Sequence, residues 1–467
     1  MRALHGGPDG PTAVFAGGAG KPHVAELPAG CAVTPAGHLC CAGFDVVELA
    51  ARHGTPLYVF NEDVIRGNCR AYGSALSGYP GGGAVAYAAK ACLTLAVAAI
   101  VQDERLHLDV VSAGELHTAL AAGFPAGRIH FHGNNKGRDE IDMALEAGIG
   151  RVVADNFRDL ELLDAAARAR GLRQDVLLRV APGIEAHTHE YIRTGGQDSK
   201  FGFDLQSGQA LEAACRLREL PGLRCTGLHA HVGSQILDTG VVPPLVQALL
   251  DLAVAARRDA GLELRELNLG GGPGIRYSAA ERTMPPAEWI GALADAVVRG
   301  CGERGLPLPF LVVEPGRSIV GEAGIAIYSV GSTKRVPGLV PWVAVDGGMG
   351  DNIRPALYGA EYTVAVGGRM RAPAEERVHV VGRYCESGDF LARAVALPRL
   401  QEGDLLAFFA AGAYQYPMAS NYNRVPRPCL LLVSEGRCDV MVERETIADL
   451  LRRDRLPGHL RASGAAR

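Results

Sequence analysis

The sequence has neither a long apolar run nor a strong excess of charge. Its longest purely apolar stretch, Leu95–Val101, falls far short of the ~20 residues that a membrane-spanning helix needs. The 47 basic and 51 acidic residues leave a net charge of −4, which excludes the strongly basic surface typical of nucleic-acid-binding proteins. No signal-peptide pattern opens the chain. We therefore expect a cytoplasmic protein with no nucleic-acid and no membrane partner.

Paired cysteines are also absent. The 11 cysteines are odd in number and scattered, and no two have the Cys-x-x-Cys spacing. This pattern excludes a disulfide framework and a zinc site of the usual kind, and it indicates reduced thiols. We expect no bound metal.

The two ends of the chain carry no recognisable chemistry. At 467 residues the chain is too long for one ordinary core, which predicts two domains. Residues 1–30 are rich in Gly, Pro and Ala and show no periodicity, so we expect a mobile leader. Residues 451–467 are basic and rich in small residues, and we expect them to fray.

Between the ends, short apolar runs alternate with Ala- and Leu-rich stretches of helical composition. Eight such runs predict strands: Ala84–Tyr87, Leu108–Val111, Ile129–His132, Arg151–Ala154, Val176–Val180, Thr226–His231, Glu266–Leu269 and Phe310–Val313. Eight repeats of strand and helix favour a parallel (β/α)8 barrel of the TIM type, in which functional groups follow the strands. A doubly wound open sheet remains the alternative, because a strand count does not show closure.

After Arg317 the pattern changes to β-type runs separated by turns, with few helices between them. This texture predicts a mainly β C-terminal domain, built as a barrel or sandwich. The expected organisation is a barrel at 56–317 and a β domain at 318–450. Residues 31–55 precede the barrel, and we expect them to join the β domain.

Lys90 ends the apolar run Tyr87-Ala88-Ala89, directly after the first predicted barrel strand. A single lysine in such a place is more often a surface residue whose stem lies on apolar neighbours. A partly desolvated amine, however, loses its proton more easily and can form a Schiff base. The other predicted strand ends decide between these interpretations.

Three later strands each end in a loop suited to an anion. They are His231-Val232-Gly233-Ser234-Gln235, Gly270-Gly271-Gly272-Pro273-Gly274 and Glu314-Pro315-Gly316-Arg317-Ser318. Glycines let backbone amides approach a phosphate, and Ser234 adds a hydroxyl. A single glycine-rich loop is usually only a tight turn, and none of these has the spacing of a nucleotide-binding loop.

Together these residues have the parts of a pyridoxal phosphate site. Lys90 would hold the aldehyde, the glycines and Ser234 the phosphate, and the Glu314 carboxylate would keep the pyridine nitrogen protonated. His231 could stack on the ring. Any one of these residues alone has a more ordinary structural explanation, but their placement around one barrel mouth favours the cofactor.

The chain resembles the fold-type III pyridoxal-phosphate-dependent decarboxylases, the group with an alanine racemase-like barrel. Within this group it is most similar to the diaminopimelate decarboxylase family. The resemblance covers about Pro56 to Val442. It is carried by an ordered set of blocks: YAAKA, HGNNKG, HTHEYIRTGGQDSKFG, HVGSQI, LGGGPGI, EPGRSIV, MGDNIRPALYGAEY, YCESGDFLA and GAYQYPMASNYNRVPRP. Pro273, the Tyr416-Pro417 pair and the long leader depart from the family pattern, but they remove no residue with an assigned role.

The resemblance implies a role for each matching residue. Lys90 would carry the cofactor, and Cys385 would return a proton to the substrate α-carbon. The implied cofactor-binding residues are Lys90, Asp109, Arg179, His231, Gly233, Ser234, Gly271, Gly272, Glu314, Gly316, Arg317 and Tyr414. The implied substrate-binding residues are Arg317, Arg354, Tyr358, Glu386 and Tyr414. Since the Cys385-Glu386 segment of this family reaches the partner's active site, a homodimer with shared active sites is implied.

The function that follows is decarboxylation of meso-2,6-diaminopimelate to L-lysine and carbon dioxide, the last step of lysine biosynthesis. The first alternative keeps the chemistry on ornithine, lysine, arginine, carboxynorspermidine or a carrier-linked amino acid. An amino-acid racemase ranks below it, and a non-catalytic regulatory homologue ranks last. Arg317, Arg354 and Glu386 favour a substrate with both a carboxylate and an ammonium at its far end.

Overall fold

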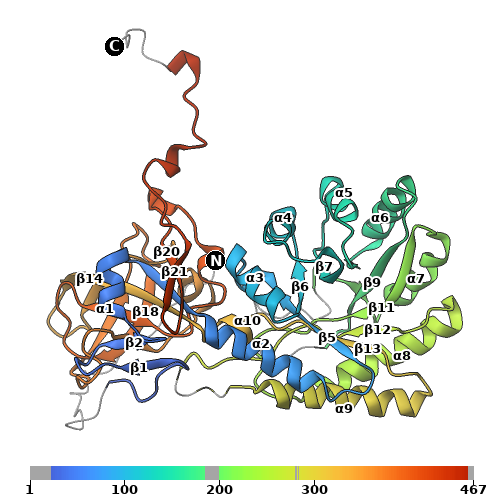
Figure 1. Ribbon diagram of the computed structural model, residues 1–467, viewed down its shortest axis with the longest axis horizontal. Helices are drawn as coiled ribbons and strands as arrows, with labels where there is room; N and C mark the ends of the chain where they lie inside the picture. The colour runs from blue at the N-terminus through green and yellow to red at the C-terminus, as the bar shows by residue number, and fades with distance from the viewer. Residues whose placement is uncertain (1–22, 185–198, 279–280, 282, 461–467) are drawn as a thin grey trace.

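The computed structural model describes residues 23–184, 199–278, 281 and 283–460. In Figure 1 two units lie side by side, a barrel surrounded by helices and a second unit made mainly of strands. The chain begins in the second unit, passes through the barrel and then returns to complete the second unit, so blue and orange-red elements lie together there in Figure 1. A short three-stranded sheet near the N-terminus belongs to neither large sheet.

The first unit is a closed parallel barrel. Strands β13 and β5 pair, and so do β8 and β9, so the eight strands form a ring. This closure confirms the predicted (β/α)8 barrel over the doubly wound open sheet. The eight strands are β5 (Gly83–Ala88), β6 (His107–Val110), β7 (Ile129–Phe131), β8 (Arg151–Ala154), β9 (Gln174–Ala181), β11 (Leu223–His229), β12 (Glu266–Asn268) and β13 (Phe310–Val313). The short β10 (Phe203–Asp204) adds a parallel pair to β9.

Helices surround this barrel: α2 (Glu62–Leu76), α3 (Leu95–Asp103), α4 (Ala113–Ala121), α5 (Arg138–Ala147), α6 (Phe157–Ala169), α7 (Gln209–Arg216), α8 (Val242–Ala260) and α9 (Pro286–Arg304). Thr94, Ser112 and Asn156 each accept a backbone N–H and so cap the starts of α3, α4 and α6. These three helices begin near the ends of the preceding strands. Across the part of the chain that the structure describes, no helix has the length and apolarity to cross a bilayer. The cytoplasmic location stays a prediction.

The second unit is the predicted mainly β domain. Its strands are β14 (Gly324–Lys334), β15 (Trp342–Val345), β16 (Val364–Val366), β17 (Glu376–Val381), β18 (Phe390–Leu397), β19 (Leu405–Phe408), β20 (Cys429–Ser434) and β21 (Arg437–Val442). The main sheet has the order β18-β17-β15-β14-β4-β20-β21, in which β4 is Leu57–Asn61, and β19 pairs with β14 and β16. Two short helices, α10 (Arg317–Val320) and α11 (Arg354–Tyr358), carry site residues.

The structure differs from the predicted boundary at residue 56. Strand β4 (Leu57–Asn61) lies in the second sheet, between β14 and β20, and is not part of the barrel. Its side chains are buried on both faces: Tyr58 and Phe60 join the large core, and Leu57 and Val59 join a smaller one. A strand followed by a helix has the same pattern in either domain, so only the pairing distinguishes them. The other boundaries stay predictions.

The segment before β4 forms its own antiparallel sheet, β1 (Cys31–Val33), β2 (Leu39–Cys41) and β3 (Phe44–Asp45), followed by α1 (Val46–His53). Leu39 and Val46 are buried in the smaller core together with Ile325 of β14 and Leu431 of β20. Residues 31–55 therefore pack against the β domain.

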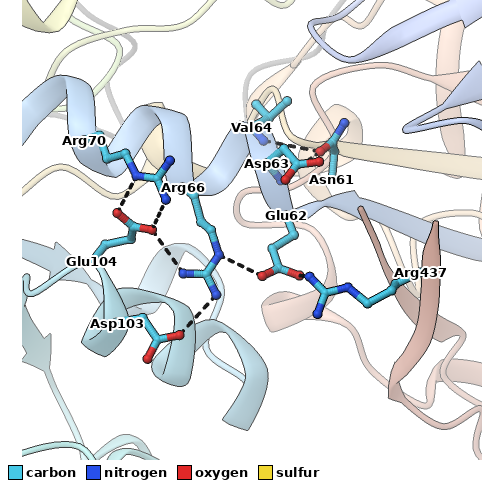
Figure 2. Close-up of polar contacts among 9 residues, drawn as sticks. All are labelled: Asn61, Glu62, Asp63, Val64, Arg66, Arg70, Asp103, Glu104 and Arg437. Carbon is cyan, nitrogen blue, oxygen red and sulfur yellow. Dashed lines mark hydrogen bonds and ion pairs between the residues drawn. The ribbon is translucent and has the colours of Figure 1, made fainter. Parts of the chain in front are cut away.

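Helix α2 carries the chain from β4 to the barrel, and an ion-pair network holds it (Figure 2). Asn61 accepts the N–H groups of Asp63 and Val64 and so caps the helix. One turn along, the Arg66 guanidinium pairs with Glu62 at 2.7 Å and with Glu104, beyond α3, at 3.0 Å. Arg437 of β21 lies 3.8 Å from Glu62. The network therefore joins the first barrel helices to the β domain.

Candidate active site

A cavity of about 340 Å³ opens at the C-terminal ends of the barrel strands. Residues from most of the barrel strand ends line it, as expected of a barrel whose chemistry lies at that face. All the predicted cofactor-binding residues line this first cavity except Gly233: Lys90, Asp109, Arg179, His231, Ser234, Gly271, Gly272, Glu314, Gly316, Arg317 and Tyr414. Gly233 lies close by, because a Cβ on Gly272 would be 3.1 Å from its carbonyl oxygen.

Lys90 projects from a single 3₁₀ turn, Ala89–Ala91, directly after β5. Both alanines are buried, whereas the lysine side chain is exposed to the cavities. Tyr414 donates its backbone N–H to the Ala91 carbonyl at 2.8 Å, and the Ala88 N–H donates to Pro315 at 3.1 Å. The turn is therefore fixed on both sides, and its one amine faces the cavity.

Glu314 follows β13 and is almost fully enclosed by polar partners. Its carboxylate accepts the Asn268 amide at 2.5 Å and lies 3.1 Å from Nε2 of both His229 and His132. Burial acts to raise the pKa of Glu314, but His132 and His229 outweigh it and hold the pKa well below its ordinary value. Glu314 therefore keeps a negative charge, which suits a protonated ring nitrogen.

The neighbouring groups respond to that charge. Burial acts to lower the pKa of His132, yet Glu314 and Asp109 raise it to about 9. The pKa of Asp109 rises to about 7 through burial and the nearby Glu314. His132 and His229 also lie close enough to Glu314 to hold a metal ion with it. A protonated His132 disfavours that use, and the absence of a metal stays a prediction.

His231 and Arg179 lie on another side of the same cavity. Burial, and then Lys90 and Arg179, lower the pKa of His231 well below its ordinary value, so the imidazole is neutral and suited to stacking on an aromatic ring. The Arg179 guanidinium packs 4.3 Å from the centroid of the Phe201 ring and lies 3.7 Å from the Asp155 carboxylate.

The glycine loops form a cradle that no other residue type would allow. A Cβ on Gly271 would lie 2.1 Å from the Glu314 carbonyl oxygen, and one on Gly316 would lie 3.0 Å from that of Ala88. Gly272 has a φ of +136°, which side chains rarely permit. Beside the cradle, the Ser234 hydroxyl accepts the Arg317 guanidinium at 3.0 and 3.2 Å. Bare backbone, a hydroxyl and a guanidinium fit a phosphate, so the residues fit pyridoxal phosphate.

A second cavity of about 510 Å³ adjoins the first. Both are lined by Lys90, His231, Ser234, Arg317 and Tyr414, and the second adds Gln235, Tyr277, Ser278, Glu281, Arg354, Tyr358, Gly359, Ala360 and Glu361. Arg317 and Arg354 are only 6% and 7% exposed. Within the described ranges neither arginine has a carboxylate within 4.0 Å, so these two buried cations have no ion-pair partner, although Glu281 and Glu361 also line the cavity.

Known proteins are similar to this chain over most of its length. The family described as "Pyridoxal-dependent decarboxylase, pyridoxal binding domain" matches residues 63–321. Diaminopimelate decarboxylase of Bacillus subtilis is 46% identical over 90% of this chain and 95% of its own. That of Synechocystis is 41% identical over 94% and 95%. The chain belongs to the diaminopimelate decarboxylase family.

Solved structures of diaminopimelate decarboxylases agree with this assignment. The diaminopimelate decarboxylase of M. jannaschii, in complex with L-lysine, has a TM-score of 0.86 at 34% identity, covering 93% of this chain and 100% of that one. The Helicobacter pylori enzyme with L-lysine has a TM-score of 0.79 at 33% identity, covering 87% and 98%. The predicted family, fold and cofactor are thereby confirmed.

Two residues that the family resemblance singles out lie apart from these cavities. Cys385 and Glu386 are exposed in the loop between β17 and β18, and neither lines the first or the second cavity. The Cys385 N–H donates to Asn423 at 2.9 Å. A single chain therefore does not bring its own Cys385 to its own Lys90.

Sequence reasoning missed several residues of the site. His132, His229 and Asn268 surround Glu314, and Tyr277 contacts both buried arginines. His132 opens the HGNNKG block, and Tyr277 lies two residues after the LGGGPGI block, so only His132 had a place in a quoted block as a signal. Most of the HTHEYIRTGGQDSKFG block lies outside the described residues.

Proposed function

We propose that this chain decarboxylates meso-2,6-diaminopimelate to L-lysine and carbon dioxide, with pyridoxal phosphate as its cofactor. One observation carries the proposal: two adjoining cavities share Lys90, and while the first fits the cofactor, the second holds two buried arginines without an acid partner. Buried guanidinium groups need anions, and a substrate carboxylate supplies one.

When bound, pyridoxal phosphate supplies an electron sink for the pair left on the substrate α-carbon as carbon dioxide departs. The chain's residues make that sink effective. Glu314 would hold its negative charge beside the ring nitrogen, the Gly271–Gly272 backbone and Ser234 would bind the phosphate, and neutral His231 would cover one ring face. Lys90 would bind the aldehyde carbon and release it to the substrate amine.

The far end of the substrate explains the second cavity. Diaminopimelate keeps a carboxylate and an ammonium at the stereocentre that does not react. Arg317 and Arg354 would bind that carboxylate with help from Tyr358 and Tyr414, and Glu386 would pair with the ammonium. Ornithine and lysine carry only an amine at that end, so a site for them has no use for buried Arg354, which lines the second cavity and not the phosphate cradle.

We also propose that two copies of the chain complete each site. The position of Cys385 and Glu386, exposed and outside the cavities of their own chain, supports their use by a partner subunit. From there, Cys385 would give its thiol proton to the α-carbon after carbon dioxide leaves. The homodimer thus supplies both the proton and the acid for the distal ammonium.

The test supplies meso-diaminopimelate to purified protein loaded with pyridoxal phosphate. Lysine and carbon dioxide should form in equal amounts, and ornithine and arginine should give far less product. Borohydride reduction followed by peptide mass analysis should place the cofactor on Lys90, and a Lys90→Ala variant should lose both the label and the activity. Full cofactor loading with no lysine formed overturns the substrate assignment. Interconversion of stereoisomers without gas release points to a racemase instead.

A further inference from the structure

Tyr277 joins the two buried arginines of the second cavity. Its hydroxyl accepts a hydrogen bond from Nη1 of Arg317. The Arg354 guanidinium carbon lies 4.7 Å from the centroid of the Tyr277 ring, and that of Arg317 lies 5.6 Å away. Tyr277 itself is only 6% exposed and lines the cavity. One phenol therefore contacts both cations at the point where a substrate anion is expected.

The backbone of Tyr277 is held from two directions. Its N–H donates to the Glu281 carboxylate at 2.8 Å, within the loop that follows β12. Its carbonyl accepts the N–H and the hydroxyl of Thr363, at 2.9 and 3.1 Å, just before β16 of the other domain. The ring also packs edge-on against Tyr362, with centroids 5.4 Å apart. The phenol is thus fixed between the two domains.

The hydrogen-bonding capacity of the Tyr277 hydroxyl limits which further partner it can have. A phenol oxygen accepts hydrogen bonds and donates one. Arg317 can only donate, so it uses an acceptor site of the Tyr277 oxygen. Arg354 can likewise only donate hydrogen bonds, and its Nη1 already donates to the Tyr362 hydroxyl at 2.5 Å. Neither arginine can receive the Tyr277 O–H hydrogen, which leaves it for an acceptor in the cavity.

We propose that Tyr277 is a recognition residue for the distal carboxylate of the substrate, to which it donates its hydroxyl hydrogen while it keeps Arg317 and Arg354 at one place. This assignment rests on the proposed function and deepens it. Removing the hydroxyl takes one donor from the carboxylate and one acceptor from Arg317. Binding of molecules that have the distal carboxylate should suffer, and binding of molecules that lack it should not.

L-Lysine and cadaverine separate these two effects, because cadaverine is lysine without its carboxylate. In Tyr277→Phe we expect the KM for meso-diaminopimelate and the inhibition constant for L-lysine to rise about 10- to 100-fold, the loss expected for hydrogen bonds to charged groups. The inhibition constant for cadaverine should change less than about 2-fold, since it offers nothing to this hydroxyl. The kcat should fall much less than the KM rises.

Tyr79→Phe is the matched control. Tyr79 is a buried tyrosine whose hydroxyl donates to the Pro309 carbonyl at 2.9 Å, between α2 and β5 and away from both cavities. It should leave both inhibition constants unchanged. If Tyr277→Phe does not fold, fluorotyrosine at position 277 keeps the ring and the hydroxyl but ionises at lower pH. Because a more acidic phenol donates its hydrogen more strongly, this variant should bind L-lysine more tightly than the wild type does, while its inhibition constant for cadaverine stays unchanged.

Equal weakening of lysine and cadaverine binding in Tyr277→Phe, or no weakening of either, overturns the role of Tyr277, and so does unchanged lysine binding by the fluorotyrosine protein. Failure of the proposed function is seen separately, because the wild-type protein itself would then make no lysine from meso-diaminopimelate.

Discussion

At the scale of single residues, the site is organised around one buried negative charge. Glu314 is 8% exposed, and a buried carboxylate is costly unless it is paired and hydrogen-bonded. Asn268 and His229 supply hydrogen bonds, and His132 supplies a positive charge. The protein therefore holds Glu314 ready for a cationic ring nitrogen, because the acid already exists in its charged form.

The His132 proton should make the stability of the cofactor-free protein depend on pH. Folding raises the His132 pKa from 6.5 to about 9, so its contribution is complete below pH 6.5 and is lost as the pH rises through 9. The pKa of Asp109 is about 7, so Asp109 does not add to the decline above that pH, whereas the thiols of Cys69, Cys92 and Cys225, whose pKa burial raises, add to it from about pH 8. His132 should account for up to about 3 kcal/mol of the loss seen in urea unfolding.

Two histidine variants isolate this effect. In His132→Gln the slope of the unfolding free energy between pH 7 and 9 should become less steep, because one of the titrating groups is gone. In His117→Gln, which changes an exposed histidine on α4, the wild-type slope should persist. An unchanged slope in His132→Gln contradicts the assignment of the proton.

Glu314 and its partners also show the limit of prediction at this scale. The acid stands in a distinctive glycine-containing loop, so the sequence indicates it directly. His132 and Asn268 do not differ from ordinary buried residues until the barrel closes, since they come from β7 and β12, far apart in the chain. Residues that act through a neighbour need the neighbour's position, and the linear pattern does not contain it.

At the scale of elements, the loops after β11, β12 and β13 are the ones proposed to bind the cofactor. They are short and rich in glycine because they pass close to one another: the Ile236 N–H donates to the Gly272 carbonyl at 2.9 Å, and the Glu314 N–H donates to the Gly270 carbonyl at 2.8 Å. These contacts connect the phosphate cradle with the acid for the ring nitrogen. A change in one loop is therefore expected to move the other.

Gly271→Ala should show this coupling. The new Cβ would lie 2.1 Å from the Glu314 carbonyl oxygen, so backbone must shift, at a cost of about 1–3 kcal/mol in stability. Pyridoxal phosphate should bind more weakly, as measured by titration of the cofactor-free protein. Gly302→Ala is the control, because its Cβ meets nothing within 4 Å and it lies inside α9. It should stabilise the fold slightly, and wild-type cofactor affinity in Gly271→Ala argues against the coupling.

The elements themselves could largely be predicted. The eight barrel strands stand within a few residues of the predicted runs, because buried parallel strands are continuous and apolar and each ends at a glycine or a polar residue. The predicted boundary at residue 56 was wrong because strand β4 (Leu57–Asn61) followed by α2 has the strand–helix pattern of a barrel repeat. Its partners β14 and β20 lie hundreds of residues later, and periodicity carries no information about such pairing.

At the scale of the whole molecule, each chain carries two separate sets of proposed functional groups. The barrel offers Lys90 and Glu314 to its own cavity, and the β17–β18 loop exposes Cys385 and Glu386 outside it. Suppose that a partner's loop completes each site. A mixed dimer of one barrel variant and one loop variant then carries both substitutions in the same site. The second site of that dimer is then intact.

Mixing Lys90→Ala with Cys385→Ala under conditions that allow subunit exchange tests this arrangement. Each variant alone should be nearly inactive. An equal mixture should recover about a quarter of wild-type activity, because half of the dimers are mixed and one of their two sites is intact. Lys90→Ala mixed with Glu314→Gln should recover nothing, since both changes lie in the barrel and each site keeps one of them. No recovery in the first mixture would falsify the shared site.

The position of β4 also has a consequence for how the chain is made. Its neighbour on one side, β20, begins at Cys429, whereas every barrel strand lies between Gly83 and Val313. A growing chain leaves the ribosome N-terminus first, so the barrel can close while β4 still lacks this neighbour. An unpaired strand edge invites association with other chains. The nascent protein therefore spends the last part of its synthesis with an open β4 edge, and translation of the final strands is what covers it.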